Sequence, residues 1–141
     1  MAPALYADFY YFTKHWGAGV FWQSMHPDFE AASGFVNRTD YKLYGASTQL
    51  NFYPDKKFLN QVNLGLRAGR RDDYFGSAAQ DEFVRADLSL RFTEFNRAYI
   101  QYENSMERYE GIRLQKNALS VEAQNNFIGW LPFGLFLEVG D

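Results

Sequence analysis

Hydrophobic and polar residues alternate along most of the chain with a period of two. The clearest stretch is 83–92, where the even positions are apolar and most odd positions are charged or polar. Successive side chains of a β-strand point to opposite faces, whereas a helix would scatter this pattern around its circumference. The alternation therefore predicts a strand with one apolar face and one polar face.

The same pattern recurs along the whole sequence and predicts about eight strands and no helix. Most runs are about 9–12 residues long, close to the length that a tilted strand needs to cross a bilayer. Strands of soluble sheets are more often about 5–6 residues long. The runs lie around 5–12, 16–25, 44–52, 61–71, 83–92, 98–103, 119–124 and 131–139.

The connections between these runs are expected to alternate between short and long. They fall near 13–15, 26–40, 54–57, 72–80, 93–97, 105–113 and 125–129. Consecutive antiparallel strands put alternate connections at opposite ends of a sheet, and transmembrane barrels have short turns at one end and long loops at the other. We therefore predict an all-β, antiparallel up-and-down transmembrane β-barrel, or part of one. Residues 1–141 form a single domain or segment with no internal boundary.

Composition narrows the classes of function. The chain has 141 residues, 47% of them apolar and 19% aromatic, so it is not typical of a disordered protein. It contains no cysteine, which excludes disulfides, a thiol nucleophile and cysteine-ligated metals. The 14 basic and 17 acidic residues give a net charge of −3, which argues against a nucleic-acid partner.

Hydropathy alone would indicate a soluble protein, because no apolar segment approaches the roughly 20 residues of a membrane helix. The first residues also lack the basic and apolar regions of a signal peptide. The aromatic residues change this picture, because many lie near strand ends, as in the belts at membrane interfaces. Examples are Phe52, Tyr53, Phe92, Phe95, Phe127 and Trp130.

The polar positions of several predicted strands would share one side of the sheet. In a soluble sandwich that side would meet bulk water, whereas in a barrel it would meet a polar lumen in which opposite charges can pair. The predicted lumen network consists of Arg67, Arg85, Asp87, Arg91, Glu103 and Glu122.

The most distinctive sequence lies between the second and third predicted strands. It contains Pro27-Asp28-Phe29, then Gly34-Phe35, then Arg38-Thr39-Asp40-Tyr41, and a later element reads Glu107-Arg-Tyr-Glu-Gly111. This pattern resembles the C-terminal barrel domain of large bacterial outer-membrane proteins that begin with a family-9-like carbohydrate-binding sandwich. The similarity is densest over 16–53. It implies a bacterial outer-membrane barrel but no reaction, because that barrel is a domain of unknown function.

Asp28, Arg38 and Asp40 are the candidates for a ligand site in this loop. We favour a structural interpretation, in which the two carboxylates flank the arginine and close the loop by ion pairing. Catalysis would require a nucleophile or base beyond these three residues. No catalytic residue is therefore predicted.

Metal and cofactor sites are not predicted either. His15 and His26 lie in separate connections and form no recognised ligand spacing. The acidic residues Asp72, Asp73, Asp81 and Glu82 could attract calcium, but they lack the spacing of a calcium loop, and two arginines lie beside them. A solvated or internally paired loop is the preferred interpretation.

The sequence thus favours a non-enzymatic outer-membrane barrel segment that acts as a scaffold, pore or docking element. Its partners would be membrane lipid and further strands of the same protein or of partner subunits, because an open sheet exposes two edges. The lack of a signal peptide suggests a piece or mature portion of a longer protein.

Two alternatives remain. One is a soluble β-barrel or sandwich that binds a small molecule or glycan in a pocket lined by Trp16, Trp22, Tyr99 and Phe136. The other is an enzyme acting on a surface polysaccharide or lipid, with Asp28 and Asp40 as its acid and base.

Overall fold

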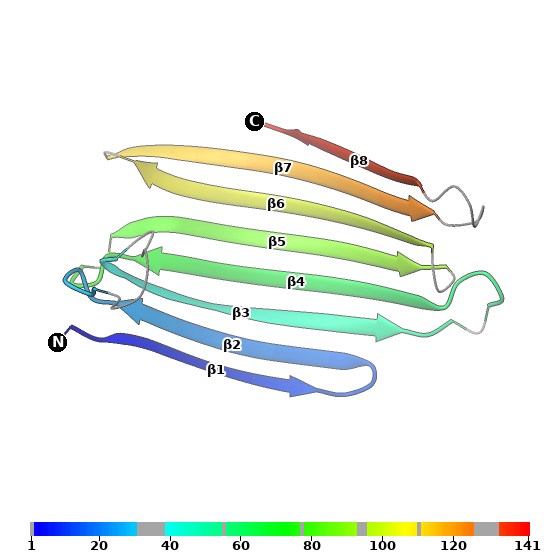
Figure 1. The fold of residues 1–141 in the computed structure, drawn as a ribbon, viewed down its shortest axis with the longest axis horizontal. Coiled ribbons are helices and arrows are strands. Elements are labelled where there is room, and N and C mark those ends of the chain that lie inside the picture. Colours follow the sequence, from blue (N-terminus) through cyan, green and yellow to red (C-terminus); the bar gives the residue numbers. More distant parts are fainter. Residues whose placement is uncertain are drawn as a thin grey trace.

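The protein, analysed as a computed structural model, is one sheet of eight antiparallel strands in the order of the chain (Figure 1). The structure describes residues 2–30, 39–54, 56–76, 78–92, 96–109, 111–125 and 133–141. The strands are β1 (Ala4–Phe12), β2 (Trp16–Met25), β3 (Tyr41–Phe52), β4 (Gln61–Asp72), β5 (Ala79–Arg91), β6 (Arg97–Tyr109), β7 (Ile112–Asn125) and β8 (Phe133–Gly140). The predicted all-β, up-and-down fold of about eight strands is confirmed.

The connection expected over 105–113 is wrong. β6 continues to Tyr109 and β7 begins at Ile112, with Gly111 at a φ of 84° in the turn between them. This φ suits glycine because it has no Cβ. The expected alternation of short and long connections therefore fails here. The physical reason is that polar residues, among them Asn104 and Asn117, stand on the otherwise apolar side of these two strands, so the hydrophobic alternation fades before the strands end. The alternation of connections also fails between β3 and β4, where the connection expected to be short covers 53–60 and is longer than the one at 73–78 that was expected to be long.

The strand register divides the side chains between two faces, because residues paired across adjacent strands share a face. The row of partners Val20, Ala46, Ala68 and Val84 crosses four strands on one side. We name this side the apolar face. It carries the even-numbered residues of β2 to β6 and the odd-numbered residues of β1, β7 and β8. The remaining strand residues form the polar face.

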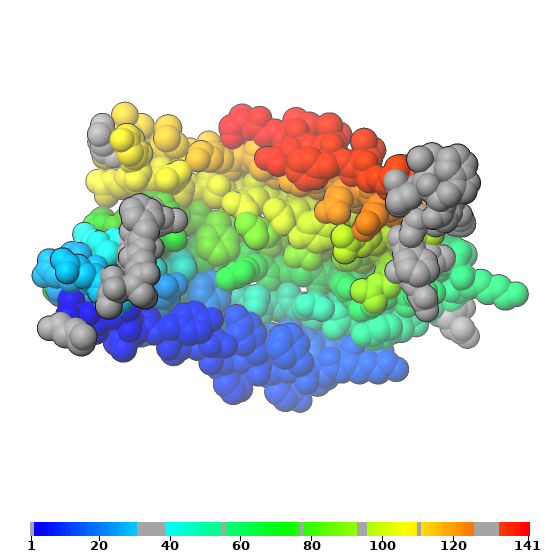
Figure 2. All heavy atoms as spheres, in the orientation of Figure 1, coloured from blue at the N-terminus to red at the C-terminus, as the bar shows by residue number. Residues whose placement is uncertain are grey.

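A single layer of strands leaves no conventional hydrophobic core. Among the described residues no large side chain is fully buried, and the most buried aromatic residues are Phe21 and Tyr41, at 6% and 7% exposed. The accessible surface is 10136 Å² for 16.4 kDa, whereas a globular monomer of this mass exposes about 7500 Å². The space-filling view shows the strands following one another from blue β1 to red β8 (Figure 2). The sheet therefore exposes surface that a globular domain would cover.

Both edges of the sheet are open in the part of the chain that the structure describes. β1 pairs only with β2, β8 pairs only with β7, and these two edge strands do not pair with each other. The sheet is therefore not closed. Within the same residues, no helix has the length and apolar character needed to cross a membrane.

Candidate functional site

Large hydrophobic side chains lie exposed in a continuous band across the apolar face. Leu66 and Val84 are each 49% exposed near its centre, and Leu137 is 55% exposed on β8. A typical soluble monomer rarely exposes so large a contiguous apolar patch. We call this surface the apolar band, and its exposed members include Phe9, Tyr11, Trp16, Val20, Trp22, Leu50, Phe52, Leu64, Leu66, Val84, Ile100, Tyr102, Leu119, Leu135, Leu137 and Val139.

Aromatic residues lie at both ends of the apolar band on two neighbouring strands. On β2 the band runs from Trp16 to Trp22, and on β3 it runs from Tyr44 to Phe52. These segments are about 20 Å and 27 Å long at about 3.3 Å per residue. The lipid-facing band of outer-membrane barrels is about 25 Å tall and is also flanked by aromatic residues. The band therefore has the aromatic borders of a lipid-facing surface.

Polar atoms inside the apolar band have partners within the sheet. The indole N–H of Trp16 donates to Thr48 Oγ1 at 3.0 Å, and the Thr48 hydroxyl donates to the carbonyl of Gly17 at 3.1 Å. An unsatisfied polar group in hydrocarbon costs several kcal/mol, so such pairing is required wherever water is excluded. This arrangement lets Thr48 lie among apolar neighbours.

A cluster of polar side chains borders the apolar band at the end of the sheet that holds the β4–β5 connection. Asp72 accepts hydrogen bonds from the Tyr44 hydroxyl at 2.8 Å and from Arg70 Nε at 2.6 Å. Arg70 Nη1 also lies 3.1 Å from Glu82 Oε1 on β5. We call Lys42, Tyr44, Arg70, Asp72 and Glu82 the polar collar. It combines both signs of charge beside the apolar surface.

On the polar face, aromatic rings occupy the space beside glycines on the neighbouring strands. Phe21 reaches over Gly45 and Phe83 reaches over Gly69, each from the directly paired position. The guanidinium of Arg67 lies 4.7 Å from the centre of the Phe21 ring and 6.0 Å from that of Phe83. This geometry is that of a cation–π interaction. In this region the side chains of the polar face therefore contact one another more closely than those of the apolar face do.

The six residues of the predicted lumen network all lie on the polar face, but their side chains form separate contacts. Arg85 Nε and Nη2 donate to Glu103 Oε2 at 2.8 and 2.5 Å. Glu122 pairs with Arg97 at 3.7 Å, and Arg97 was not among the predicted residues. Arg67 contacts the two rings described above, the Asp87 carboxylate lies beside Gly65, and Arg91 is exposed at the end of β5.

The loop candidates Asp28 and Asp40 have different surroundings. The Asp28 side chain is 86% exposed and lies 3.8 Å from His26 Nδ1. Asp40 adopts a φ of 64°, a conformation that aspartate tolerates, and its Oδ1 accepts a hydrogen bond from the backbone N–H of Tyr74 at 3.3 Å. Arg38 lies outside the described residues, as do Gly34, Phe35, Phe95, Phe127 and Trp130. No contact in the described part of the chain joins Asp28 to Asp40.

The acidic residues at the end of β4, in the connection after it and in β5 are paired within the protein, as the paired interpretation expected. Asp72 and Glu82 pair with Arg70, Asp81 pairs with Arg71, and Asp73 accepts a hydrogen bond from Gln80 at 2.6 Å. Asp81 and Glu82 belong to β5 and not to a loop. In the described ranges, no group of three or more histidine or acidic residues has the geometry of a metal site.

The soluble alternative predicted one pocket lined by four aromatic residues, and this prediction is wrong. The register places Trp16 and Trp22 on the apolar face and Tyr99 and Phe136 on the polar face. Four side chains on opposite sides of one sheet cannot line one pocket. Spacing along the sequence did not reveal this, because the face of each residue depends on the register between strands.

Sequence reasoning also missed the ring contacts of Arg67 and the ion pair between Arg97 and Glu122. The glycines at positions 45 and 69 were a usable sign, because a glycine inside a strand often marks a close approach by a neighbouring group. No protein-family model, curated protein or solved structure matches the chain.

Proposed function

We propose that this chain forms part of the wall of a bacterial outer-membrane β-barrel. The apolar face contacts lipid and the polar face lines an aqueous lumen. The observation that carries the proposal is the separation of side chains by strand register on β4 and β5: exposed Leu66 and Val84 on one face, and charges such as Arg85 on the other. The polar face also exposes hydrophobic side chains on the outer strands, such as Phe12 on β1 and Phe136 on β8. The resemblance of the loop between β2 and β3 to an outer-membrane barrel domain supports the same location.

The open edges support further strands as partners. β1 and β8 contain neither lysine nor proline, the residues that commonly protect exposed sheet edges from pairing. Their outward residues, such as Phe9 and Leu137, continue the apolar band to both edges. Additional strands, from the same protein or from partner subunits, would extend the wall at β1 and β8 and satisfy their backbone groups.

Within this wall the chain acts as a scaffold, pore or docking element and not as an enzyme. The charges on the polar face neutralise one another in pairs such as Arg85 and Glu103, and do not converge on a common point where a substrate would react. A lumen lined by such pairs would pass or hold polar molecules without transforming them.

The test is to transfer the protein from denaturant into lipid-free buffer, detergent micelles or lipid vesicles. We expect β-structure by circular dichroism, protease resistance and heat-modifiable gel migration only with detergent or lipid. A folded, monodisperse protein in lipid-free buffer would contradict the proposal and favour the soluble β-protein.

A further inference from the structure

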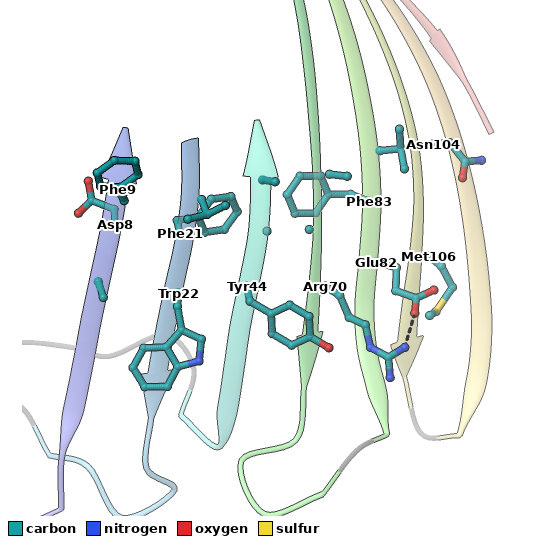
Figure 3. Close-up of a pocket in the computed structure, with 17 residues that line it drawn as sticks. Asp8, Phe9, Phe21, Trp22, Tyr44, Arg70, Glu82, Phe83, Asn104 and Met106 are labelled. Carbon is teal, nitrogen blue, oxygen red and sulfur yellow. Dashed lines mark ion pairs between the residues drawn. The ribbon is translucent and has the colours of Figure 1, made fainter. Parts of the chain in front are cut away.

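A hollow of about 880 Å³ lies where the apolar band meets the polar collar. Most of its lining residues belong to the apolar face, and the others are Asp8, Phe21, Gly45, Gly69 and Phe83 of the polar face. Ala46 and Ala68 are among the residues that line the hollow. The larger side chains of Phe9, Trp22 and Tyr44 also line it (Figure 3). Small residues paired across β3 and β4, with aromatic residues of β1 to β3 on one side and Val84 and Met106 on the other, produce a groove in an otherwise bulky surface. The hollow is therefore a property of the register and not of a loop.

The walls of the groove change from apolar to charged along the strands. One row of cross-strand partners contains Val20, Ala46, Ala68 and Val84, which are all apolar. The next row contains Trp22, Tyr44, Arg70 and Glu82. The second row places aromatic residues beside charges, the arrangement found where a membrane protein crosses from hydrocarbon to headgroups.

The charged end of the groove presents both signs to the outside. Arg70 and Glu82 form an ion pair (dashed in Figure 3), and their side chains remain 39% and 45% exposed. A ligand that carries only negative charge would meet the carboxylate of Glu82 as well as the guanidinium. A ligand with an anion and a cation a few atoms apart would complement both groups.

We propose that this groove binds a zwitterionic phospholipid with a phosphoethanolamine headgroup. This inference rests on the proposed function, which places the apolar face in a bilayer. One acyl chain lies over Ala46 and Ala68. An empty groove lined by apolar atoms lacks dispersion contacts, and an acyl chain in it would supply them. The phosphate lies at Arg70, a residue type suited to phosphate geometry, and the ammonium group lies at Glu82.

Tryptophan fluorescence tests the site directly, because Trp22 lines the groove and Trp16 lies at the opposite end of the apolar band. The chain has three tryptophans, so the double variant Trp16→Phe/Trp130→Phe reports on Trp22 alone, and Trp22→Phe/Trp130→Phe reports on Trp16. Each is reconstituted in vesicles that contain a small fraction of phosphoethanolamine or phosphoglycerol lipid with brominated acyl chains, which quench nearby indoles.

We expect brominated phosphoethanolamine lipid to associate with the Trp22 site about fivefold more strongly than brominated phosphoglycerol lipid, the preference that one exposed charge pair supplies. Trp16 should be quenched equally by both lipids. Ala68→Leu, which fills the groove, should remove the preference at Trp22. Ala86→Leu is the matched control, because Ala86 lies on the same face but outside the groove, and it should leave the preference intact.

Glu82→Gln should reduce the preference for phosphoethanolamine lipid, because it removes the partner of the ammonium group. Equal quenching of Trp22 by the two lipids, or a preference unchanged in Ala68→Leu, would overturn the lipid site while quenching of Trp16 still supported a lipid-facing sheet. Absence of quenching at both tryptophans would overturn the proposed function itself.

Discussion

Alternate residues of the same strands form the two faces of this sheet, yet the side chains of the two faces differ in how many contacts they make within the protein. On the apolar face, Val84 of β5 and Leu66 of β4 are each 49% exposed, and the strands contact only their neighbours in the sheet within the described residues. On the polar face, Phe21 is 6% exposed beneath Arg67, and Arg85 is paired with Glu103. On these inner strands the polar face is therefore stabilised by contacts within the sheet, and under the proposed function the apolar face is stabilised by lipid.

The largest expected effect comes from placing a charge on the apolar face. Leu88→Arg should destabilise the protein in vesicles by about 2–4 kcal/mol, the cost of arginine near the bilayer midplane. Ser89→Arg is the matched control, because Ser89 points to the polar face opposite Asn63 and Tyr99 and should be tolerated far better. Urea-induced unfolding from vesicles measures both. An equally small loss of stability for both variants would contradict the assignment of one face to lipid and the other to water.

A smaller effect is expected from adding bulk to adjacent positions on opposite faces. A Cβ at Gly45 would lie 2.5 Å from Cζ of Phe21, so Gly45→Val should cost about 1–3 kcal/mol through overpacking. Ala46→Val adds two carbon atoms, one fewer than Gly45→Val, to the exposed apolar face and should change stability little, since valine also favours strands. The same unfolding measurement compares the two. A greater loss for Ala46→Val would reverse the proposed roles of the faces.

The smallest effect concerns the ion pairs of the polar face. The Arg85–Glu103 pair is close and its side chains are 38% and 25% exposed, whereas Arg97 and Glu122 lie 3.7 Å apart at 63% and 45%. A double-mutant cycle to alanine should give a coupling of about 0.5–1 kcal/mol for the first pair and near zero for the second. A larger coupling energy for the second pair would contradict this ranking of the two ion pairs on the polar face.

The fold was predictable where apolar residues alternate with polar ones, and less so elsewhere. β2 was predicted with its observed bounds, Trp16–Met25, and β4 within one residue of them. The ends of β6 and β7 were missed because Asn104 and Asn117 put polar groups on the apolar face, so period-two hydrophobicity no longer marks a strand there. The pattern thus marks where a strand has one apolar and one polar face, and not where the strand ends.

The candidate contacts were less predictable than the fold, for a physical reason. Which residues share a face depends only on parity and register, so Arg67, Arg85 and Glu103 were grouped correctly on one side. Which of them touch depends on side-chain geometry across strands. Arg67 faces Arg85 directly in the register, yet it contacts Phe21 and Phe83 while Arg85 turns to Glu103.

The most direct test of the two-faced wall is the accessibility of successive positions along β5 in vesicles. The chain has no native cysteine, so single cysteines at 84–90 can carry a nitroxide whose collisions with oxygen report lipid and with a water-soluble nickel complex report the aqueous lumen. We predict two opposite period-two profiles, with oxygen highest at Val84, Ala86, Leu88 and Leu90 and nickel highest at Arg85, Asp87 and Ser89. Profiles in phase with each other, or nickel access equal at all seven positions, would contradict a sheet with lipid on one face and water on the other.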